Sequence, residues 1–434
     1  MEPPRLSDLT AVHRAVAEPK AWLAGRGAKG FAAARDEFLM KIRKTGRKVP
    51  IVVAQKKTAA YLAGVLSSVE QMLPVVLANP HWGEVEWAQA AAQIMPGIWF
   101  GEKRANWPHP KPEENFEAKD WKGAILIPTG GTGGRVRWAV HHWNTLAAAA
   151  RALGDFLEAE GCIHVSTLPP WHISGLMPAV RAIETGGMLW LENWKALEGG
   201  QGPKIEPERA IISLVPTQLQ RLLTKKKVMA WLKNTRAILL GGAPPSPGLL
   251  EEARRQRLPM ALAYGMTETA ALVALQPPKD FLAGKPPYAT PLPHAKIYLG
   301  KNRRILIRAK SLFSGYYPVP RPLGVLVTED FGKMDARGRI LPLGRLDRVI
   351  NTGGEKINPV DLEDQILATG LVKKVRVVGL PDAEWGERVV ALYTGARPSE
   401  AKLRKALKKR VARHAIPKTW IRVKTLPAAG KKFS

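Results

Sequence analysis

Short apolar runs separated by amphipathic stretches dominate the chain from residue 121 onward. The runs that predict buried strands lie at 124–127, 163–168, 188–191, 210–215, 237–240 and 260–264. Between the first two, a helix is predicted at 143–159, where Leu146, Leu153 and Leu157 share one side. Short strands that alternate with helices indicate a largely parallel sheet with helices on both faces.

The pattern is less regular on either side of this region. Before it, helices are predicted at 6–23 and 56–73, a strand at 73–78, and a surface connection over 99–120. After it, polar alternation at 297–307 and 324–328 predicts strand pairs.

A compact unit follows. It has a helix that begins with Asn358 as cap and Pro359 in its first turn, strands at 375–380 and 388–393, and a basic helix at 399–413. The pattern changes near 345–347 from strand pairs to this compact unit, which predicts two domains, residues 1–345 and 346–434.

Composition narrows the class of protein. The 434 residues are 45% hydrophobic and 24% charged, as in soluble globular proteins. One cysteine excludes an intramolecular disulfide and a cysteine metal site. No stretch approaches the ~18 consecutive apolar residues of a membrane span, and the first residues have no apolar signal core. The sequence therefore predicts a cytoplasmic protein.

The net charge of +29 has three interpretations. It could bind nucleic acid, gather polyanionic small substrates, or reflect a basic bias of the whole genome. No RNA-binding motif or interleaving of aromatic and basic residues accompanies it, so nucleic acid is the least favoured partner.

A glycine-rich loop follows the strand at 124–127. It reads Thr129-Gly130-Gly131-Thr132-Gly133-Gly134 and is followed by Arg135 and Arg137. Such a loop offers bare amide N–H groups, hydroxyls and guanidinium groups, which together suit a polyphosphate. The alternative is a flexible turn between strands. The loop is not a Walker motif, because no Gly-Lys-Ser/Thr follows at the required spacing.

Other polar or glycine-containing segments also follow predicted strands. They are the loop with His172, Gly241-Gly242-Ala243, and Gly265-Met-Thr267-Glu268. Since ligands of parallel sheets bind beyond the carboxyl ends of the strands, these segments could line one cleft.

Nine motifs occur in a fixed order from residue 121 to the end of the chain. They are TGGTGGRVR, PPWHISGL, LLGGAPP, YGMTE, FSGYY, TEDFG, GRLDRVINTGGEKINPVDLE, VVGLPDAEWGE and LPAAGK. In this order they resemble the acyl-adenylate-forming (AMP-binding) superfamily of acyl- and aryl-CoA ligases. The resemblance implies an α/β protein with a large N-terminal α/β domain of layered sheets and helices and a small mobile α+β C-terminal domain.

The resemblance also implies a reaction and roles for residues. A carboxylate attacks the α-phosphate of ATP to give acyl-AMP, and CoA then displaces AMP. The residues implied at the β- and γ-phosphates are Thr129, Gly130, Gly131, Thr132, Gly133, Gly134 and Arg137. Thr267 is implied at the α-phosphate and Glu268 at Mg2+. Gly241, Gly242, Ala243 and Tyr264 are implied at adenine, Asp330 and Arg345 at ribose, and Gly265 as a further cofactor-binding residue.

The C-terminal domain supplies the remaining implied roles. Lys431 would bridge the carboxylate and the α-phosphate in the first half-reaction, Asp347 would be the hinge, and Gly353 and Gly354 would line the pantetheine tunnel in the second. Taken alone, Glu268 is more often a surface carboxylate, and Lys431 a lysine of a frayed tail. Only their place in the series of motifs favours a catalytic role.

The sequence departs from the family pattern at three places. Gly130 and Gly133 replace hydroxyl residues of the loop, Arg137 replaces a lysine, and Glu329 replaces the glycine of a common Thr-Gly-Asp. No charged catalytic group is lost, so we expect an active enzyme.

Within the superfamily, PTGGTGGRVRWAVHHW, PPWHISGLMPAVRAIETGG and SLVPTQLQRLL are most similar to o-succinylbenzoate–CoA ligases of menaquinone or phylloquinone synthesis, in particular the short forms of photosynthetic bacteria. That substrate has a second carboxylate, which needs a cationic or hydrogen-bonding anchor. The candidate anchors are His172, Ser174, Arg181, Thr217 and Gln218.

Two alternatives stay open. Another aryl- or acyl-acid CoA ligase would share the adenylation residues, and a non-enzymatic nucleotide- or nucleic-acid-binding protein would account for the charge. The predicted partners are a small carboxylic acid, ATP and CoA; the sequence does not fix the oligomeric state, and a homodimer is one option.

Overall fold

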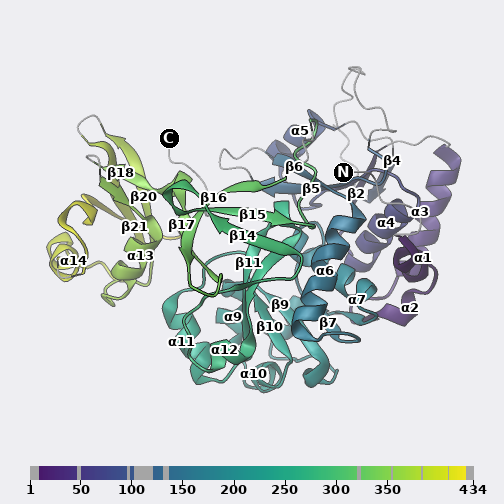
Figure 1. Ribbon diagram of the computed structural model, residues 1–434, viewed down its shortest axis with the longest axis horizontal. Coiled ribbons are helices and arrows are strands. Elements are labelled where there is room, and N and C mark those ends of the chain that lie inside the picture. The colour runs from purple at the N-terminus through teal and green to yellow at the C-terminus, as the bar shows by residue number, and fades with distance from the viewer. Residues whose placement is uncertain are drawn as a thin grey trace.

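The chain forms two parallel-type sheets with helices packed between them, an antiparallel sheet, and a separate smaller sheet near the C-terminus (Figure 1). This computed structural model describes residues 9–45, 50–94, 98–101, 121–130, 136–319, 324–352, 355–382, 385–408 and 410–426. Within those ranges, no helix is long and apolar enough to cross a membrane.

The largest sheet has eight strands, parallel from β1 to β11 and antiparallel from β11 to β13. In spatial order they are β1 (Leu23–Gly25), β8 (Met188–Leu191), β7 (Ile163–Ser166), β9 (Ala210–Leu214), β10 (Ala237–Leu240), β11 (Met260–Met266), β12 (Ala271–Gln276) and β13 (Thr290–Pro291). The predicted parallel sheet is confirmed.

The second sheet has five strands and is built mostly from the first 101 residues. Its order is β4 (Ile98–Gly101), β2 (Ile51–Ala54), β3 (Val75–Leu77), β5 (Ile125–Gly130) and β6 (Val136–His141). Only β5 and β6 pair in antiparallel fashion. The predicted surface connection at 99–120 is wrong at its start, because residues 98–101 pair with β2 at the edge of this sheet; residues 102–120 lie outside the described ranges.

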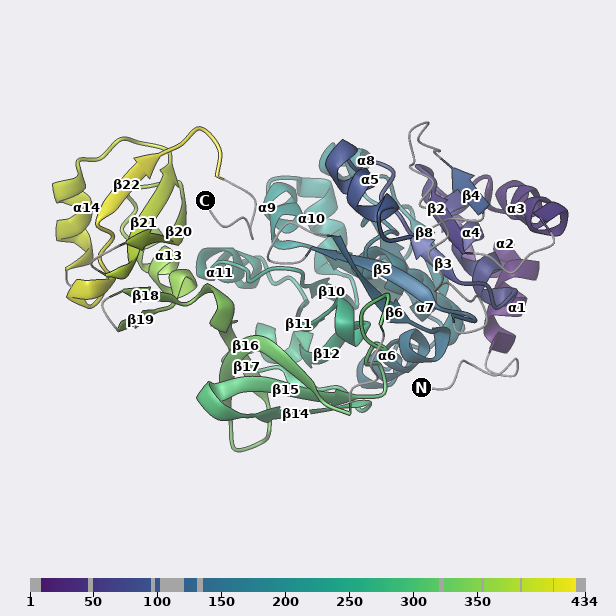
Figure 2. The same cartoon turned by 90° about the horizontal axis from the view of Figure 1, so that it is seen from above.

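Helices pack on both sides of these sheets, as Figures 1 and 2 show. Between the sheets lie α1 (Thr10–Ala17), α3 (Phe31–Thr45), α4 (Thr58–Glu70), α6 (Trp143–Leu157) and α7 (Ile173–Glu184). The outer face of the large sheet is covered by α9 (Pro216–Leu222), α10 (Lys226–Lys233) and α11 (Pro247–Arg255). The outer face of the second sheet is covered by α5 (Glu84–Ala91). The shorter helices are α2 (Pro19–Trp22), α8 (Trp194–Glu198) and α12 (Pro278–Leu282).

Two smaller sheets complete the fold. The first is antiparallel, with β14 (Ala295–Leu299), β15 (Arg304–Ala309), β16 (Leu326–Met334) and β17 (Ile340–Arg345). The second holds β19 (Glu355–Ile357), β18 (Ile350–Thr352), β21 (Gly386–Thr394), β20 (Lys374–Asp382) and β22 (Thr419–Arg422), with helices α13 (Pro359–Leu367) and α14 (Glu400–Leu407). This last unit has its own apolar core and lies to one side in both ribbon views.

Local signals explain two helix starts. The Asn358 side chain accepts from the Val360 amide and Pro359 opens α13, as predicted. For α9, the sequence favours Thr217 as the cap residue, and this prediction is wrong: Val215 occupies the cap position, Pro216 is the first residue of α9, and the Gln218 side chain accepts from the Val215 amide. Proline at a first helical position was the better signal. The predicted helix at 399–413 is shorter and ends at Leu407.

Candidate active site

The carboxyl ends of β7, β9, β10 and β11 meet at one edge of the large sheet, because these strands are parallel neighbours. The segments that follow them carry His172, Thr217, Gly241–Ala243 and Tyr264–Thr267. Gly242 has a φ of +83°, in the left-handed region that favours glycine. The structure therefore brings the predicted strand-end candidates of this sheet to one edge.

The first cluster joins this edge to the antiparallel sheet. The Tyr264 hydroxyl donates to Oδ2 of Asp330 at 2.9 Å, and Arg345 Nη1 lies 3.6 Å from Oδ1 of the same carboxylate. Asp330 and Arg345 are cross-strand partners on β16 and β17. Burial, and then the charge of Asp330, raise the pKa of Tyr264 well above its usual value, so the hydroxyl stays a donor.

Glu329, the residue that departs from the family pattern, points away from this cluster. It forms an ion pair with Arg304 at 3.2 Å. Its side chain is 43% exposed, so it adds little charge to the cluster.

The second cluster joins the large sheet to the second sheet. The Tyr316 hydroxyl donates to Oε1 of Glu268, and the Arg137 guanidinium lies over the Tyr316 ring at 4.4 Å from its centre. Arg137 is the cross-strand partner of Thr129 on β5. The Thr129 hydroxyl is buried without a hydrogen-bond partner among the described residues. An unpartnered hydroxyl beside an exposed guanidinium suits an anionic ligand.

The turn that carries Thr267 and Glu268 is fixed from several sides. A Cβ on Gly265 would lie 1.5 Å from the Ala271 carbonyl oxygen, so only glycine fits there. His141 Nε2 lies 2.7 Å from the Thr267 carbonyl oxygen and therefore carries the proton that it donates. Burial lowers the pKa of His141 to about 4, which keeps the ring neutral.

The candidate anchors of a second carboxylate do not share one environment. His172 and Thr217 are exposed at the strand-end edge. The Gln218 side chain contacts other residues of the protein. Its Oε1 accepts from the Val215 amide at the start of α9, and its Nε2 lies 3.5 Å from the Thr167 hydroxyl. Ser174 and Arg181 are seven residues apart on α7 and therefore lie on the same side of this helix.

Arg181 is 4% exposed, so it is a core residue rather than a surface one. Its Nη1 lies 3.4 Å from the Ser213 hydroxyl on β9. Among the described residues, its Nε has no hydrogen-bond partner and no acidic side chain lies within ion-pair distance of it. Burial lowers its pKa from 12.5 to about 10.

His164 on β7 lies close enough to this guanidinium to be affected by its charge. The ring is 2% exposed, and neither of its nitrogens has a hydrogen-bond partner in the described part of the chain. Burial, and then the charge of Arg181, lower its pKa to about 3. Arg181, His164 and Ser213 thus form a buried polar cluster with donors and acceptors left unused.

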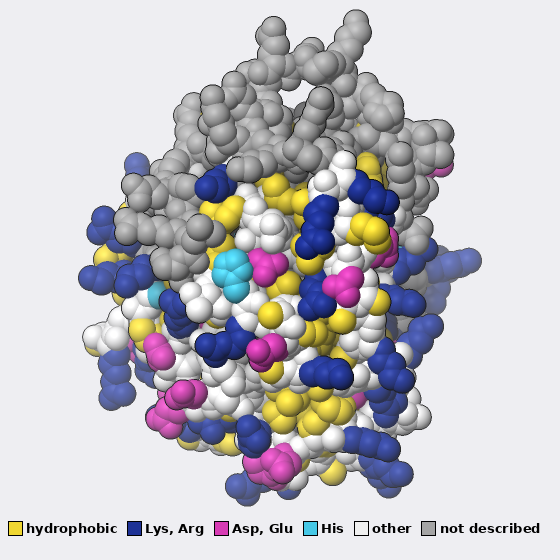
Figure 3. Space-filling view, turned by 90° about the vertical axis from the view of Figure 1, so that its right-hand side faces the viewer, with side chains coloured by type: hydrophobic (Ala, Val, Ile, Leu, Met, Phe, Trp, Pro, Cys, Tyr) yellow, Lys and Arg dark blue, Asp and Glu magenta, His cyan; other side chains and the backbone are white. Residues whose placement is uncertain are grey.

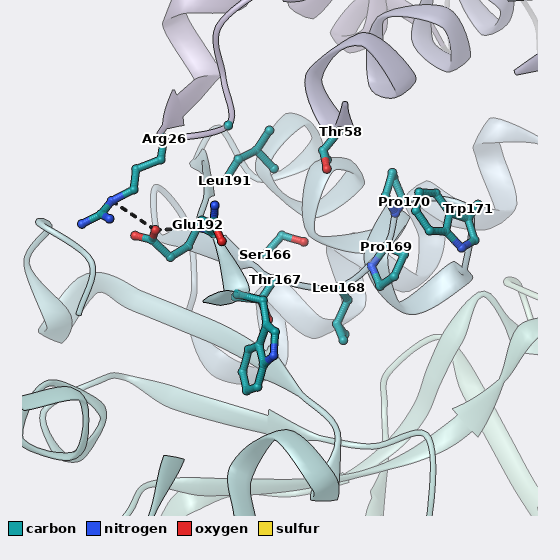
Figure 4. Close-up of a pocket in the computed structure, with 13 residues that line it drawn as sticks. Arg26, Thr58, Ser166, Thr167, Leu168, Pro169, Pro170, Trp171, Leu191 and Glu192 are labelled. Carbon is teal, nitrogen blue, oxygen red and sulfur yellow. Dashed lines mark hydrogen bonds and ion pairs between the residues drawn. The ribbon is translucent and has the colours of Figure 1, made fainter. Parts of the chain in front are cut away.

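A pocket of about 330 Å³ lies at the ends of β7 and β8 (Figure 4). Ser166, Trp171, Thr58 and the Arg26–Glu192 ion pair line it, with 3.4 Å between Arg26 Nε and Glu192 Oε1. Val165 on β7 pairs with Ile212 on β9, so Ser166 is next to Ser213 on adjacent strands. Ser166, which lines the pocket, is therefore adjacent to the buried cluster of Arg181.

Several predicted site residues lie outside the described ranges. They are Gly131, Thr132, Gly133, Gly134, Gly353, Gly354 and Lys431. Asp347 lies in a short turn, Leu346–Arg348, between β17 and β18, and only its backbone is described.

Sequence reasoning missed four residues of these clusters. Tyr316 stands in the motif FSGYY but was not singled out. His141, His164 and Ser213 stand in strand segments. The sequence signal that could have identified them is a polar residue within an apolar run.

Among the described residues, no group of three His, Cys, Asp or Glu side chains could hold a metal ion. Glu268 is a single carboxylate that is joined to the Arg137 guanidinium through the Tyr316 side chain. This suits Mg2+, which proteins commonly hold through one or two carboxylates together with substrate phosphates.

The match to two family models shows the class of enzymes to which the chain belongs. The chain matches the model of the AMP-binding enzymes over residues 36–317, and that of the AMP-binding enzyme C-terminal domain over residues 361–431. It therefore belongs to the AMP-binding enzyme family.

The relatives to which the chain is similar include two ligases of the same name. The chain is 32% identical over 330 residues to a 2-succinylbenzoate–CoA ligase of Listeria monocytogenes, a match that covers 71% of this chain and 68% of the relative. It is 29% identical over 329 residues to the ligase of the same name from Geobacillus kaustophilus, with 70% and 66% covered.

Solved structures agree in fold. An o-succinylbenzoate CoA synthetase (MenE) from Bacillus subtilis, in complex with its acyl-adenylate intermediate, superposes with a TM-score of 0.80 at 22% identity and covers 97% of this chain and 95% of its own. The amide bond synthetase McbA from Marinactinospora thermotolerans gives 0.77 at 19% identity, with 98% and 97% covered. The same fold thus occurs in a CoA synthetase and in an amide bond synthetase.

Proposed function

We propose that the protein is an ATP-dependent carboxylate–CoA ligase that acts on 2-succinylbenzoate in the cytoplasm, within menaquinone or phylloquinone synthesis. Membership of the AMP-binding enzymes and the relatives named as 2-succinylbenzoate–CoA ligases support the reaction class. The observation that carries the choice of acid is the buried Arg181, which lacks an acidic partner among the described residues.

A buried cation without a counter-ion is costly, so a fold retains one where a ligand supplies the missing anion. Ser174 shares the Arg181 side of α7 and stands two residues after His172 at the strand-end edge. A substrate that is activated at this edge could thus extend a second carboxylate along α7 toward the guanidinium. A dicarboxylate offers one carboxylate for activation and a second one for the guanidinium. In 2-succinylbenzoate, one carboxylate is on the ring and the other is on the chain.

The first half-reaction joins the acid to ATP. A carboxylate oxygen attacks the α-phosphorus, the bond to the β-phosphate breaks, and pyrophosphate leaves. In this proposal, Thr129 to Gly134 and Arg137 hold the departing phosphates, and Thr267 contacts the α-phosphate. Mg2+, when bound at Glu268, neutralises phosphate charge as it develops.

The nucleoside is held by the first cluster. Tyr264 and the segment Gly241–Ala243 flank the adenine, and Asp330 accepts from the ribose hydroxyls while Arg345 holds the Asp330 carboxylate. Positioning and charge stabilisation are sufficient here, because ATP already contains the leaving group.

The second half-reaction makes the thioester. The CoA sulfur attacks the acyl carbon and AMP leaves. Lys431 serves only the first half-reaction, after which the unit of residues 346–434 turns at Asp347 and brings Gly353 and Gly354 beside the pantetheine. The unit has its own core and its own sheet, which is consistent with movement as a rigid body.

The charge of +29 is not assigned to nucleic acid. On the described part of the face in Figure 3, Lys and Arg are spread among Asp and Glu and do not form a single basic groove. The presence of Glu268, Asp330, Arg345 and Lys431 in one chain also argues against a non-enzymatic nucleotide-binding protein.

A pyrophosphate-release screen tests the proposal. Purified protein with ATP, Mg2+ and CoA should release pyrophosphate with 2-succinylbenzoate, and far more slowly with benzoate. Release with a different acid would support the second candidate, another aryl- or acyl-acid ligase. No release with any acid would refute the assignment as a ligase.

A further inference from the structure

Tyr316 lies between two side chains of opposite charge. Its hydroxyl donates to Oε1 of Glu268, and its ring faces the Arg137 guanidinium at 4.4 Å. Among the described residues, neither Arg137 nor Glu268 has an ion-pair partner within 4.0 Å. The two charges are neighbours of the same ring and yet do not pair with each other.

The backbone around Tyr316 fixes this ring in place. The segment Ser314–Tyr317 runs beside β6: the Ser314 amide donates to the Val140 carbonyl at 2.7 Å, and the Tyr317 amide donates to the Trp138 carbonyl at 3.0 Å. Ala139 and Tyr316 form a bridge between these hydrogen bonds. The ring is therefore attached to the strand that carries Arg137.

The turn that carries Glu268 is attached to the same segment. The Phe313 amide donates to the Glu268 carbonyl at 2.9 Å, and the Phe313 ring packs edge-to-face on Tyr316 at 4.9 Å. Two sheets therefore meet at Tyr316. Both charged side chains contact this one residue.

We propose that Tyr316 is a positioning residue that keeps Arg137 and Glu268 apart, so that the guanidinium stays available for a phosphate and one carboxylate oxygen stays available for Mg2+. The ligands follow from the proposed function, on which this inference rests. The physical reason comes from the two groups themselves. A guanidinium and a carboxylate within reach form a strong, often bidentate pair, which a ligand would have to break before binding.

The chemistry of the phenol suits this task. The face of its ring attracts the Arg137 guanidinium, and its hydroxyl donates to the Glu268 carboxylate. One side chain therefore partly satisfies both charged groups while it separates them. Burial, and then the charge of Glu268, raise the pKa of Tyr316 above its usual value, so the hydroxyl remains protonated as a donor.

Two variants separate the roles of hydroxyl and ring. Tyr316→Phe keeps the stacking surface and removes the donor, whereas Tyr316→Leu removes both. Tyr317→Phe is the matched control, because Tyr317 packs on Trp121 instead. ATP binding is measured by calorimetry in EDTA and over a series of Mg2+ concentrations, so the readout does not depend on turnover.

The two variants should differ. For Tyr316→Phe, the Mg2+ concentration needed for half-maximal enhancement of ATP binding should rise about 10-fold, as expected for a lost hydrogen bond to a charged group. Its ATP affinity in EDTA should stay unchanged. For Tyr316→Leu, ATP affinity in EDTA should also fall about 10-fold, because Arg137 then pairs with Glu268.

A double variant gives the decisive result. Adding Glu268→Gln to Tyr316→Leu removes the competing carboxylate, so affinity for ATP in EDTA should recover. Failure to recover would overturn the spacer role, and so would an unchanged Mg2+ requirement in Tyr316→Phe. If the wild-type protein itself bound no ATP, the proposed function would fail instead, so the two failures are distinguishable.

Discussion

Replacement of Arg181 by methionine should change stability and activity in opposite directions. Methionine fills much of the same volume without a charge. The change removes a guanidinium that is 4% exposed and lacks an acidic partner among the described residues. The unliganded protein should therefore become more stable, while binding of a dicarboxylate should become weaker.

The magnitude of the stability change follows from the pKa of this side chain. Burial lowers it from 12.5 to about 10. Each pH unit corresponds to about 1.4 kcal/mol, so the fold holds the charged form at a cost of about 3 kcal/mol. Arg181→Met should recover a part of this free energy of unfolding, reduced by the lost contact of Arg181 Nη1 with the Ser213 hydroxyl.

The effect on activity follows from the lost hydrogen bonds. A hydrogen bond to a charged group contributes about 1.5–3 kcal/mol, so kcat/KM for 2-succinylbenzoate should fall about 10- to 100-fold. The KM for ATP should stay unchanged. An analogue that lacks the anchored carboxylate should lose little further activity in the variant, because its partner is already absent.

Calorimetric unfolding and steady-state kinetics on the same preparations give both readouts. Arg151→Met is the matched control, since Arg151 is exposed on α6 and pairs with Glu184 at 2.6 Å. A variant at Arg181 that unfolds more easily and acts equally on all acids would refute the reasoning. Arg181 would then be a structural core residue.

Three further outcomes are expected. Asp330→Asn should raise the KM for ATP about 10-fold and leave that for the acid unchanged, with a smaller effect for Tyr264→Phe, as measured by initial rates. The unfolded state binds a proton at His141 near pH 6.5, whereas the folded state does so only near 4. His141 should thus lower the free energy of unfolding by up to about 3 kcal/mol as the pH drops through this window, and the total fall, to which His164 also contributes, should be smaller in His141→Gln, as measured by denaturant titration. Lys431→Ala should abolish acyl-AMP formation and spare thioester formation from supplied acyl-AMP; equal loss of both half-reactions would contradict the two-conformation mechanism.

The strand ends of the large sheet were predictable because most of its strands are short, largely apolar runs. Parallel strands place their carboxyl ends at one edge, so the sequence alone groups Gly241 with Tyr264. The pairing of Asp330 with Tyr264 depends on contact between two sheets. Only the order of the motifs indicated it.

The buried polar cluster of Arg181, His164 and Ser213 was harder to predict. Arg181 lies on an amphipathic helix, where an arginine is normally exposed. It is buried because α7 is packed between two sheets, and three of the five strands of the second sheet are runs of only three or four residues within the first 101 residues. Such short runs carry too little periodicity to predict a sheet.

Tyr316 shows a different limit. Its role depends on a segment that runs beside β6, more than 170 positions earlier in the chain. No local pattern indicates this pairing. The motif containing Tyr316 was recognised, but the contact that gives the residue its place was not.

The most direct test is to identify the products of one reaction mixture. Protein, ATP, Mg2+, CoA and 2-succinylbenzoate are incubated together, and the mixture is analysed by mass spectrometry. The proposed function predicts equal amounts of AMP, pyrophosphate and the CoA thioester of the acid, with none formed when any one component is omitted. ADP in place of AMP, or AMP formed without the acid, would contradict it.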